Sequence, residues 1–259
     1  MLGAIFGDIV GSVYEFTPTH DYNFPLLTKE STFTDDTICT IAIADAYMHG
    51  RDYYRYFLRK WCAAYPTPMG GYGARFSEWL RSPNPCAYYS WGNGSAMRVS
   101  ALGWLCSSLD KVLQEATYSA ACTHNHPAGI RGAQAVAAAV YLARTGIGKD
   151  ELLEYVQKMF SYPVLHEHLE DYRGWFDESC EGTVPAAFLC IRDSHDFESA
   201  IRLAVSLGAD ADTLGAIVGA IAEALYGMPE ELKAETLKRL PEDMKNVYNS
   251  FKYIVYGNA

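Results

Sequence analysis

Apolar residues recur at the spacing of an α-helix along most of this chain, and no stretch alternates with the period of two that marks a half-buried strand. This pattern predicts an all-α protein, built as a layered bundle around three or four apolar helices. Because no linker or break in composition divides the sequence, we expect a single domain over residues 1–259. The predicted helical segments are 2–14, 37–48, 51–63, 96–107, 111–122, 128–144, 151–160, 184–192, 197–207 and 214–227, followed by two amphipathic segments after Pro229 and Pro241.

Three of these segments, 37–48, 128–144 and 214–227, are apolar around almost the whole helix, which predicts that they are buried. The first predicted helix carries Gly3, Gly7 and Gly11 at a spacing of four, and 214–227 carries Gly215 and Gly219. Glycines at this spacing form a smooth stripe that lets a second helix approach closely.

Polar and helix-breaking residues mark where several helices begin and end. Asp150 and Asp196 are predicted to cap the helices that follow them, and Pro127 and Pro185 to lie in a first turn. Gly208 is predicted to end the helix that begins after Asp196. The stretch 161–182 is polar and aromatic, and its pattern assigns it to no element.

Two acidic clusters, Thr34-Asp35-Asp36 and Asp210-Ala-Asp212-Thr213, lie directly before apolar helices. Buried carboxylates are costly unless they are neutralised, by a helix N-terminus and above all by a cation. If the two helices pair at their N-terminal ends, four carboxylates and two hydroxyls form an oxygen-only ligand set, which suits Mg²⁺ or Mn²⁺ and not Zn²⁺. Four acids imply more than one ion. The alternative is that each cluster only caps its own helix.

Other candidate residues are weaker individually. The glycine clusters at 70–73 and 91–94 are either turns or places where backbone amides approach phosphate oxygens. His124 and His126 point in different directions on a helix, so they are poor co-ligands, and one is expected to be a cap or to bond a substrate. Glu15 follows a glycine-rich helix and is either a mobile general base or a solvated surface acid.

Composition and charge limit the partners and the compartment. With 21 Lys and Arg against 31 Asp and Glu the net charge is −10, which argues against nucleic acids and anionic membranes but not against a small phosphorylated ligand. Seven cysteines without CxxC spacing indicate thiols of a reducing compartment. The N-terminus does not read as a signal peptide, and no apolar run has the length of a membrane span. We therefore expect a soluble, cytoplasmic protein.

Six motifs in order carry a resemblance that covers residues 3–228. They are GAIFGDIVGSVYEF, TDDT, GGYGARF, SWGNGSAMR, THNHP and GADADTLGAIVGAIAEALYG. Together they resemble the ADP-ribosylglycohydrolase family, the dinitrogenase-reductase-activating and ARH-like hydrolases. The resemblance implies a single-domain orthogonal helical bundle with a binuclear magnesium site at buried helix N-termini.

Carried over residue by residue, the resemblance implies three groups of site residues. The implied metal ligands are Thr34, Asp35, Asp36, Asp210, Asp212 and Thr213. The backbone at Gly71, Tyr72 and Gly73 is implied to face the diphosphate, and the proximal ribose and its neighbours are implied to be held by Ser90, Trp91, Gly92, Asn93 and His124. Glu15 corresponds to the acidic residue on the family's mobile entrance loop.

The activity that this resemblance implies is hydrolysis of the glycosidic bond at C1 of ADP-ribose, in an ADP-ribosylated protein or a small ADP-ribose conjugate. Two Mg²⁺ ions, or Mn²⁺, would fix the ribose diol and orient a water, while Glu15 or Asp36 manages the proton. Two alternatives stay open: a non-catalytic ADP-ribose-binding or structural member, and a Mg-dependent phosphoester or pyrophosphate hydrolase. The acceptor linkage (arginine, serine, nucleobase or ester) and the oligomeric state stay open too.

Overall fold

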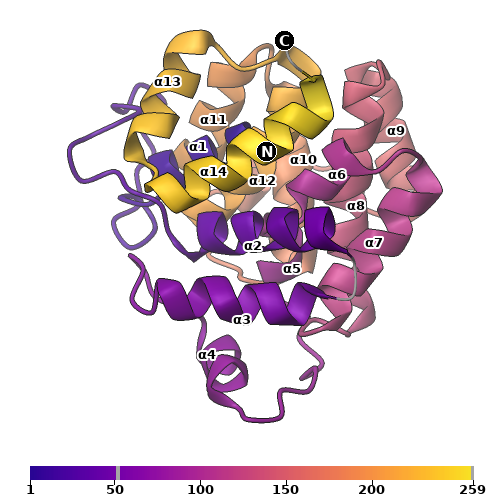
Figure 1. Cartoon of the computed structure of the whole chain (residues 1–259). Helices are drawn as coiled ribbons and strands as arrows, with labels where there is room; N and C mark the ends of the chain where they lie inside the picture. The colour runs from indigo at the N-terminus through magenta and orange to yellow at the C-terminus, as the bar shows by residue number, and fades with distance from the viewer. Residues whose placement is uncertain (51–52, 258–259) are drawn as a thin grey trace.

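The computed structural model describes residues 1–50 and 53–257, and within these the protein is helical, with two isolated β-bridges and no strand. The all-α prediction is confirmed. Figure 1 shows the elements, which are α1 (Leu2–Gly11), α2 (Asp35–His49), α3 (Tyr54–Ala64), α4 (Ala74–Arg81), α5 (Gly94–Met97), α6 (Ser100–Leu105), α7 (Leu109–Ala121), α8 (Pro127–Arg144), α9 (Lys149–Phe160), the 3₁₀ helix η2 (Leu169–Tyr172), α10 (Cys180–Asp193), α11 (Phe197–Ser206), α12 (Ala211–Tyr226), α13 (Glu230–Arg239) and α14 (Glu242–Tyr256).

The glycine stripes predicted on the first helix and on 214–227 meet each other, because α1 packs along α12. The approach is so close that a Cβ added to Gly7 would lie 1.9 Å from the carbonyl oxygen of Gly215, and one added to Gly3 would lie 2.3 Å from that of Gly219. Side chains larger than hydrogen would therefore separate the two backbones. This contact joins the first helix of the chain to one near its end.

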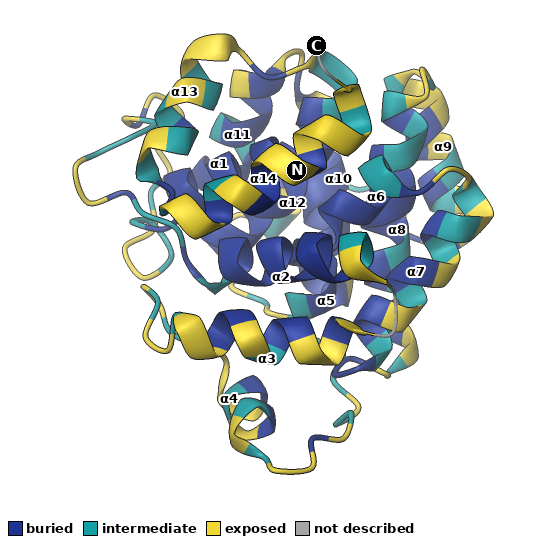
Figure 2. Cartoon of the chain, in the orientation of Figure 1, coloured by how far each residue is buried: buried dark blue, intermediate teal, exposed yellow. Residues whose placement is uncertain are grey.

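The helices predicted to be buried form the interior, which Figure 2 shows in dark blue along α2, α8 and α12. Helix α8 contacts both α12 and α7, and α2 packs against α3. Outer helices such as α3 and α14 alternate buried and exposed residues, as the amphipathic pattern predicts. Helix α4 and its flanking loops extend beyond α3 at the bottom of the view in Figure 1.

Several predicted boundaries were wrong. The segment 96–107 is divided between α5 and α6, because the backbone turns at Arg98, whose buried guanidinium donates to the Ser119 carbonyl at 3.0 Å. Gly148, not Asp150, is the N-cap of α9. Helix α10 begins at Cys180 because the Ser179 hydroxyl accepts from the Gly182 N–H, so Pro185 lies inside the helix and not in its first turn.

Other terminal signals are confirmed. Asp196 caps α11 in a capping box, Gly208 follows the end of that helix with a φ of +71°, and Pro127 begins α8. Residues 51–52, with which the predicted third helix begins, lie outside the described residues.

The unassigned stretch 161–182 forms a loop that contains η2 and ends in the first turn of α10. The loop lies against the 91–93 segment, because the Asn93 N–H donates to the Glu178 carbonyl at 2.7 Å and the Cys180 N–H to the Trp91 carbonyl at 2.9 Å. All seven cysteines are free thiols. Among the described helices, none combines the length and the apolarity that a bilayer crossing requires.

Candidate metal and substrate site

The two acidic clusters meet at the N-terminal ends of α2 and α12. Thr34 is the N-cap of α2, and its hydroxyl accepts from the Asp36 N–H at 3.2 Å. The Thr213 hydroxyl, in the first turn of α12, donates to Asp36 Oδ2 at 3.2 Å and so links the two clusters directly. Thr34 therefore caps its own helix, as one interpretation of the sequence predicted. The acidic clusters of the two helices also lie next to each other, as the other interpretation predicted.

An acid that the sequence interpretation did not assign, Asp8, lies beside these clusters. Asp8 is fully buried on α1, where it accepts from the Thr34 N–H at 3.0 Å, the Thr34 hydroxyl at 2.7 Å and the Thr37 N–H at 3.0 Å. The Thr37 hydroxyl donates to it as well. These bonds tie α1 to the start of α2. The sequence contained one signal for Asp8: it is the single acid inside an otherwise apolar helix that carries a stripe of glycines, and a buried acid needs partners.

The charges of the clustered acids oppose one another. Burial, followed by the charge of Asp212, raises the pKa of Asp8 to about 7, although the hydrogen bonds from Thr37 and Thr34 oppose this shift. The same two causes, in the same order, raise the pKa values of Asp35, Asp36 and Asp210 well above their usual range. Burial and then Asp212 also raise the pKa of Glu15, to about 8. The cluster therefore favours any group that brings positive charge.

A cavity of about 480 Å³ opens onto both clusters. Most of the predicted site residues line it, namely Glu15, Asp35, Asp36, Gly71, Tyr72, Gly73, Ser90, Gly92, Asn93, His124, Asp210, Asp212 and Thr213. Its lining also includes residues that the sequence interpretation did not assign, such as Arg75, Phe176 and Glu178. Phe176 and Glu178 come from the loop before α10, whose pattern gave no element to place.

The glycine loop at 70–73 is held beside the start of α2 by a bridge between Met69 and Thr34. Gly70 has a φ of +76° and comes so close to Glu15 that an added Cβ would lie 2.6 Å from Glu15 Oε2. No atom lies within 4 Å of a Cβ added to Gly71 or Gly73, and both residues line the cavity.

Elsewhere in the cavity lining, hydrogen bonds within the protein hold the Asn93 side chain. Its amide nitrogen donates to Asp210 Oδ2 at 2.7 Å and to the Thr183 hydroxyl at 3.0 Å. Trp91 is placed differently from its neighbours: its side chain is half exposed, packs edge-on against the His126 ring and is not among the residues that line the cavity. His126 caps α8.

His124 lines the cavity with a neutral imidazole ring. Arg98 Nη2 donates to the Thr123 hydroxyl at 2.8 Å, and that hydroxyl shares a hydrogen bond of 2.7 Å with His124 Nδ1. The other ring nitrogen, Nε2, lies beside Gly94, where an added Cβ would be 3.2 Å from it. Burial, then the charges of Arg98 and Arg75, lowers the pKa of His124 well below its usual range, which keeps the ring neutral.

The donor chemistry of the clusters fits a hard cation. Asp36 Oδ1 and Glu15 Oε2 are buried and have no hydrogen-bond partner within the described part of the chain, and every predicted ligand atom is an oxygen. The side-chain conformations in this structure are not those of a metal-bound site. Among residues 1–50 and 53–257, no three His, Cys, Asp or Glu side chains lie close enough together to hold an ion. Small rotations of carboxylates would have to accompany binding.

Comparison with known proteins identifies the family of this chain. The profile of the ADP-ribosylglycohydrolase family matches residues 1–253. The chain belongs to the ADP-ribosylglycohydrolase family. Its family resemblance, predicted from six motifs, is thus confirmed over nearly the whole sequence, and with it the prediction of an enzyme of the ADP-ribosylglycohydrolase class.

Several named proteins of this family are similar to the chain. ADP-ribosylarginine hydrolase Tri1 of Pseudomonas putida is 28% identical over 89% of this chain and 71% of its own length. ADP-ribosylhydrolase ARH3 of Mus musculus is 26% identical over 89% of this chain and 83% of its own length. The ADP-ribosyl-[dinitrogen reductase] glycohydrolase of Rhodospirillum rubrum is 26% identical over 94% of this chain and 89% of its own length. A solved structure, an ADP-ribosylglycohydrolase-related protein complex, shares the fold with a TM-score of 0.70 at 24% identity, covering 98% of this chain and 97% of the other.

Proposed function

We propose that this ADP-ribosylglycohydrolase family member hydrolyses the glycosidic bond between ADP-ribose and an acceptor, in an ADP-ribosylated protein or a small ADP-ribose conjugate, with residues 1–259 acting as one domain. The observation that carries the proposal is the convergence of both acidic clusters on one cavity, which the Thr213–Asp36 hydrogen bond joins. A volume of about 480 Å³ lies within the usual range of ligand cavities, roughly 300–1,000 Å³.

We propose further that the clusters hold two Mg²⁺ ions, with Mn²⁺ as a substitute, through Thr34, Asp35, Asp36, Asp210, Asp212 and Thr213. When bound, the ions would neutralise the acids and polarise ribose and water oxygens. The hydrogen bond from Asn93 would hold Asp210 in the orientation that ligation needs, and Asp8 would do the same for Thr34 through its two hydrogen bonds. Glu15 and Asp36 are the proposed proton carriers.

The other walls of the cavity would bind the ADP-ribose part of the substrate. The open backbone at Gly71–Gly73 can approach a diphosphate without steric hindrance from a side chain. Ser90 and Gly92, with the Nε2–H of His124, would surround the ribose next to the scissile bond; Trp91, half exposed, could contribute only at the rim. Together these contacts would fix the ribose at the acids, so that much of the rate enhancement comes from positioning.

The proposal is tested by incubating chelator-treated protein with an ADP-ribosylated peptide, or with ADP-ribose itself, in the presence of Mg²⁺, Mn²⁺ or Zn²⁺. We expect free ADP-ribose from the peptide with Mg²⁺ or Mn²⁺. AMP released from ADP-ribose would indicate a pyrophosphate hydrolase instead, and binding without turnover would indicate a non-catalytic member. Restoration of activity by Zn²⁺ alone would contradict the oxygen-only ligand set. A panel of arginine, serine, nucleobase and ester conjugates would then identify the linkage.

Replacing Glu15 by Gln is expected to lower turnover by about 10²-fold or more, because the amide cannot carry the proton that the reaction transfers. The measurement is kcat on the ADP-ribosylated peptide, with circular dichroism as a check that the helices persist. Since Gln has the shape of Glu, the close approach to Gly70 is preserved. An unchanged kcat would identify Glu15 as a bystander at the edge of the cavity.

Replacing Thr123 by Val is expected to raise KM about tenfold with a smaller effect on kcat, because His124 loses the hydroxyl that bonds to Nδ1 and fixes the tautomer of the ring. Thr123→Ser retains the hydroxyl and should behave like the wild type. The imidazole tautomer can be followed by ¹⁵N NMR, a readout independent of activity. If Thr123→Val left both the tautomer and KM unchanged, the hydrogen-bond chain from Arg98 would have no part in substrate binding.

A further inference from the structure

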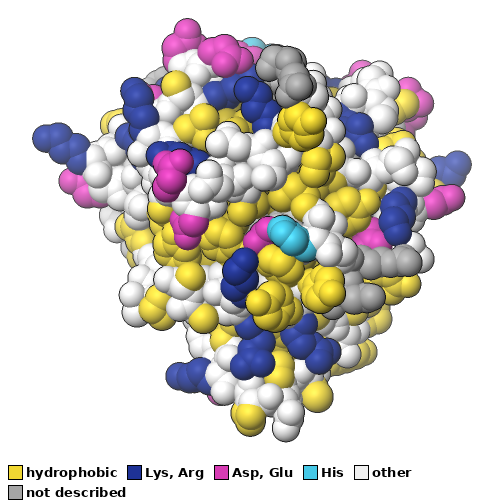
Figure 3. All heavy atoms as spheres, in the orientation of Figure 1, with side chains coloured by type: hydrophobic (Ala, Val, Ile, Leu, Met, Phe, Trp, Pro, Cys, Tyr) yellow, Lys and Arg dark blue, Asp and Glu magenta, His cyan; other side chains and the backbone are white. Residues whose placement is uncertain are grey.

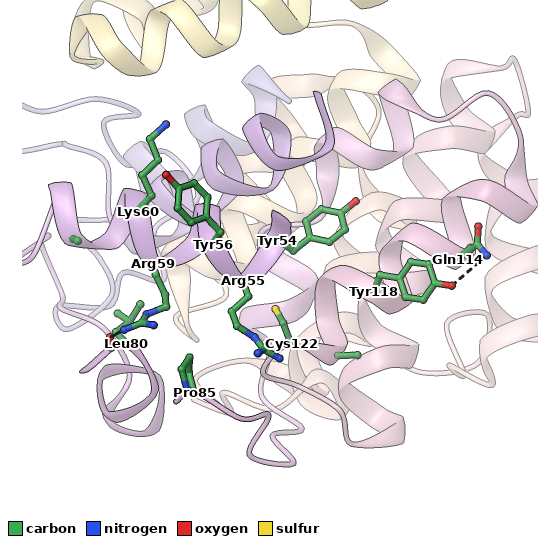
Figure 4. Close-up of a pocket in the computed structure, with 12 residues that line it drawn as sticks. Tyr54, Arg55, Tyr56, Arg59, Lys60, Leu80, Pro85, Gln114, Tyr118 and Cys122 are labelled. Carbon is green, nitrogen blue, oxygen red and sulfur yellow. Dashed lines mark hydrogen bonds between the residues drawn. The ribbon is translucent and has the colours of Figure 1, made fainter. Parts of the chain in front are cut away.

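A second hollow, larger than the candidate site, lies between α3, the loop after α4 and α7. Its volume is about 1320 Å³, and it shares no lining residue with the cavity described above. Figure 4 shows its lining side chains, with Arg55 and Arg59 of α3 directed toward Cys122 and Leu80 respectively. We refer to this hollow as the α3 groove. Its size exceeds the usual range of small-ligand pockets, roughly 300–1,000 Å³, which favours an extended occupant.

The charge of the α3 groove is opposite to that of the protein as a whole. Arg55, Arg59 and Lys60 line it, and no Asp or Glu is among the described residues that do so. Figure 3 shows Lys and Arg side chains gathered over the region of α3, between patches of hydrophobic surface. On a chain whose net charge is −10, this concentration of cations makes a local site for a negatively charged partner.

The cations of the groove are only partly neutralised by the protein. Lys60 Nζ lies 3.5 Å from Asp45 Oδ2. Arg59 donates to two neutral carbonyls, those of Leu80 at 3.2 Å and Ser82 at 2.9 Å. Within the described residues, no acid forms an ion pair with Arg55 or Arg59. Their charge is therefore available to a partner.

Aromatic side chains lie beside these cations. Tyr56 is 61% exposed and Tyr118 is 47% exposed, and both line the groove. Tyrosine and arginine together are the residue types that protein-binding surfaces favour, because they combine apolar contact with hydrogen bonding. The groove thus offers contact area as well as charge.

The α3 groove and the candidate site share two walls. Ala74 at the start of α4 lines the cavity, and Leu80 near its end lines the groove; at a rise of about 1.5 Å per residue these positions are about 9 Å apart along the helix. Cys122 lines the groove, and His124, two positions on, lines the cavity. An extended peptide covers about 9 Å with about three residues.

We propose that the α3 groove binds an acidic segment of an ADP-ribosylated protein whose modified residue occupies the cavity. The proposal rests on the proposed function and adds to it a substrate class: acceptors whose modified residue has Asp or Glu a few positions away. A protein segment fits better than a nucleic acid, because a long polyanion would extend beyond the groove along a chain in which Asp and Glu outnumber Lys and Arg, 31 to 21.

The test compares peptides that carry the same ADP-ribosylated residue, flanked by glutamates, by glutamines or by lysines. We expect kcat/KM to be about three- to tenfold higher for the glutamate peptide than for the glutamine peptide, through KM, and to be lowest for the lysine peptide. The preference should weaken at high salt. Arg55→Glu should reverse the order of the glutamate and lysine peptides, which no general loss of folding could produce. Lys158→Glu, on the exposed face of α9, is the matched control and should change nothing.

Binding is measured separately from catalysis with an unmodified, fluorescein-labelled oligoglutamate. Its fluorescence anisotropy should rise with wild-type protein and with Lys158→Glu, but not with Arg55→Glu. Equal kcat/KM for all three peptides, or binding that survives Arg55→Glu, would overturn the proposal. Binding of a single-stranded oligonucleotide at least as tightly as oligoglutamate would overturn it in favour of a nucleic acid. If no peptide is turned over yet oligoglutamate binds at Arg55, the proposed function fails and the groove's specificity for acidic segments stands.

Discussion

Replacing Asp36 or Asp212 by Asn is expected to abolish the rise in melting temperature that Mg²⁺ produces in the wild type. If the acids of α2 and α12 share one ionic site, the ion binds only the folded state and stabilises it, by about 2.7 kcal/mol at a hundredfold excess over Kd. Removing one ligand charge removes most of that affinity, and hydrolysis should fall by at least about 10²-fold with it. Differential scanning fluorimetry over a range of Mg²⁺ concentrations provides the measurement.

Without metal the same variants should be no less stable than the wild type, and by as much as about 2 kcal/mol more stable, because each removes one member of a mutually repelling set. The double variant Asp36→Asn/Asp212→Asn should lose little beyond either single variant, since one site cannot be destroyed twice. Independent caps would behave in the opposite way. Additive losses of stability in a protein that ignores Mg²⁺ would exclude a shared site and the mechanism that depends on it.

Replacing Gly7 by Ala is expected to destabilise the protein by at least about 3 kcal/mol, at the upper end of what overpacking costs. The added Cβ would lie 1.9 Å from the Gly215 carbonyl oxygen, and a backbone atom cannot turn aside as a side chain can. Gly→Ala normally stabilises a helix interior by about 1 kcal/mol, so the expected sign is itself diagnostic. Urea titration followed by circular dichroism measures the change.

The control for this substitution is Gly148→Ala, at a position where no atom lies within 4 Å of the added Cβ. Since Gly148 is the N-cap of α9, we expect a change of about 1 kcal/mol or less. Gly7→Ala should also weaken the Mg²⁺ response, because separating α1 from α12 moves the neighbouring Asp8 away from Thr34 and Thr37. Equal, small effects of both substitutions would contradict the close packing of α1 on α12.

The interior of the fold was predictable because it depends on sequence patterns within single helices. Helices without a polar face must be buried, and glycines at a spacing of four identify the side on which a neighbour approaches; the Gly7–Gly215 contact joins two such stripes. The break at Arg98 was not predictable in this way. Arg98 is buried and donates to the Ser119 carbonyl on another helix, a contact that no pattern within 96–107 contains. The loop 161–179 had no period to interpret, and its place is set by bonds to residues near position 92.

The candidate site was predictable to the extent that its residues come in motifs. The clusters around Asp36 and Asp212 could be paired from the sequence because each precedes an apolar helix, and the structure brings them together. Asp8 was missed because a lone acid in an apolar helix has no partner in sequence; its four donors come from Thr34 and Thr37. The neutral state of His124 likewise depends on burial and on the charge of Arg98, neither of which a spacing rule in the sequence contains.

The packing of α1 along α12 also governs when the protein can fold. Gly3 and Gly219 are in contact although the ribosome adds more than two hundred residues between them, so the pairing has a high contact order. During synthesis α1 emerges before α12, and its residues Leu2, Ile5 and Ile9 lack their partner helix until α12 has been made. Asp8 lies on α1 and is therefore synthesised early, whereas the second acidic cluster is synthesised with the start of α12. The two acidic clusters therefore cannot meet until α12 has left the ribosome.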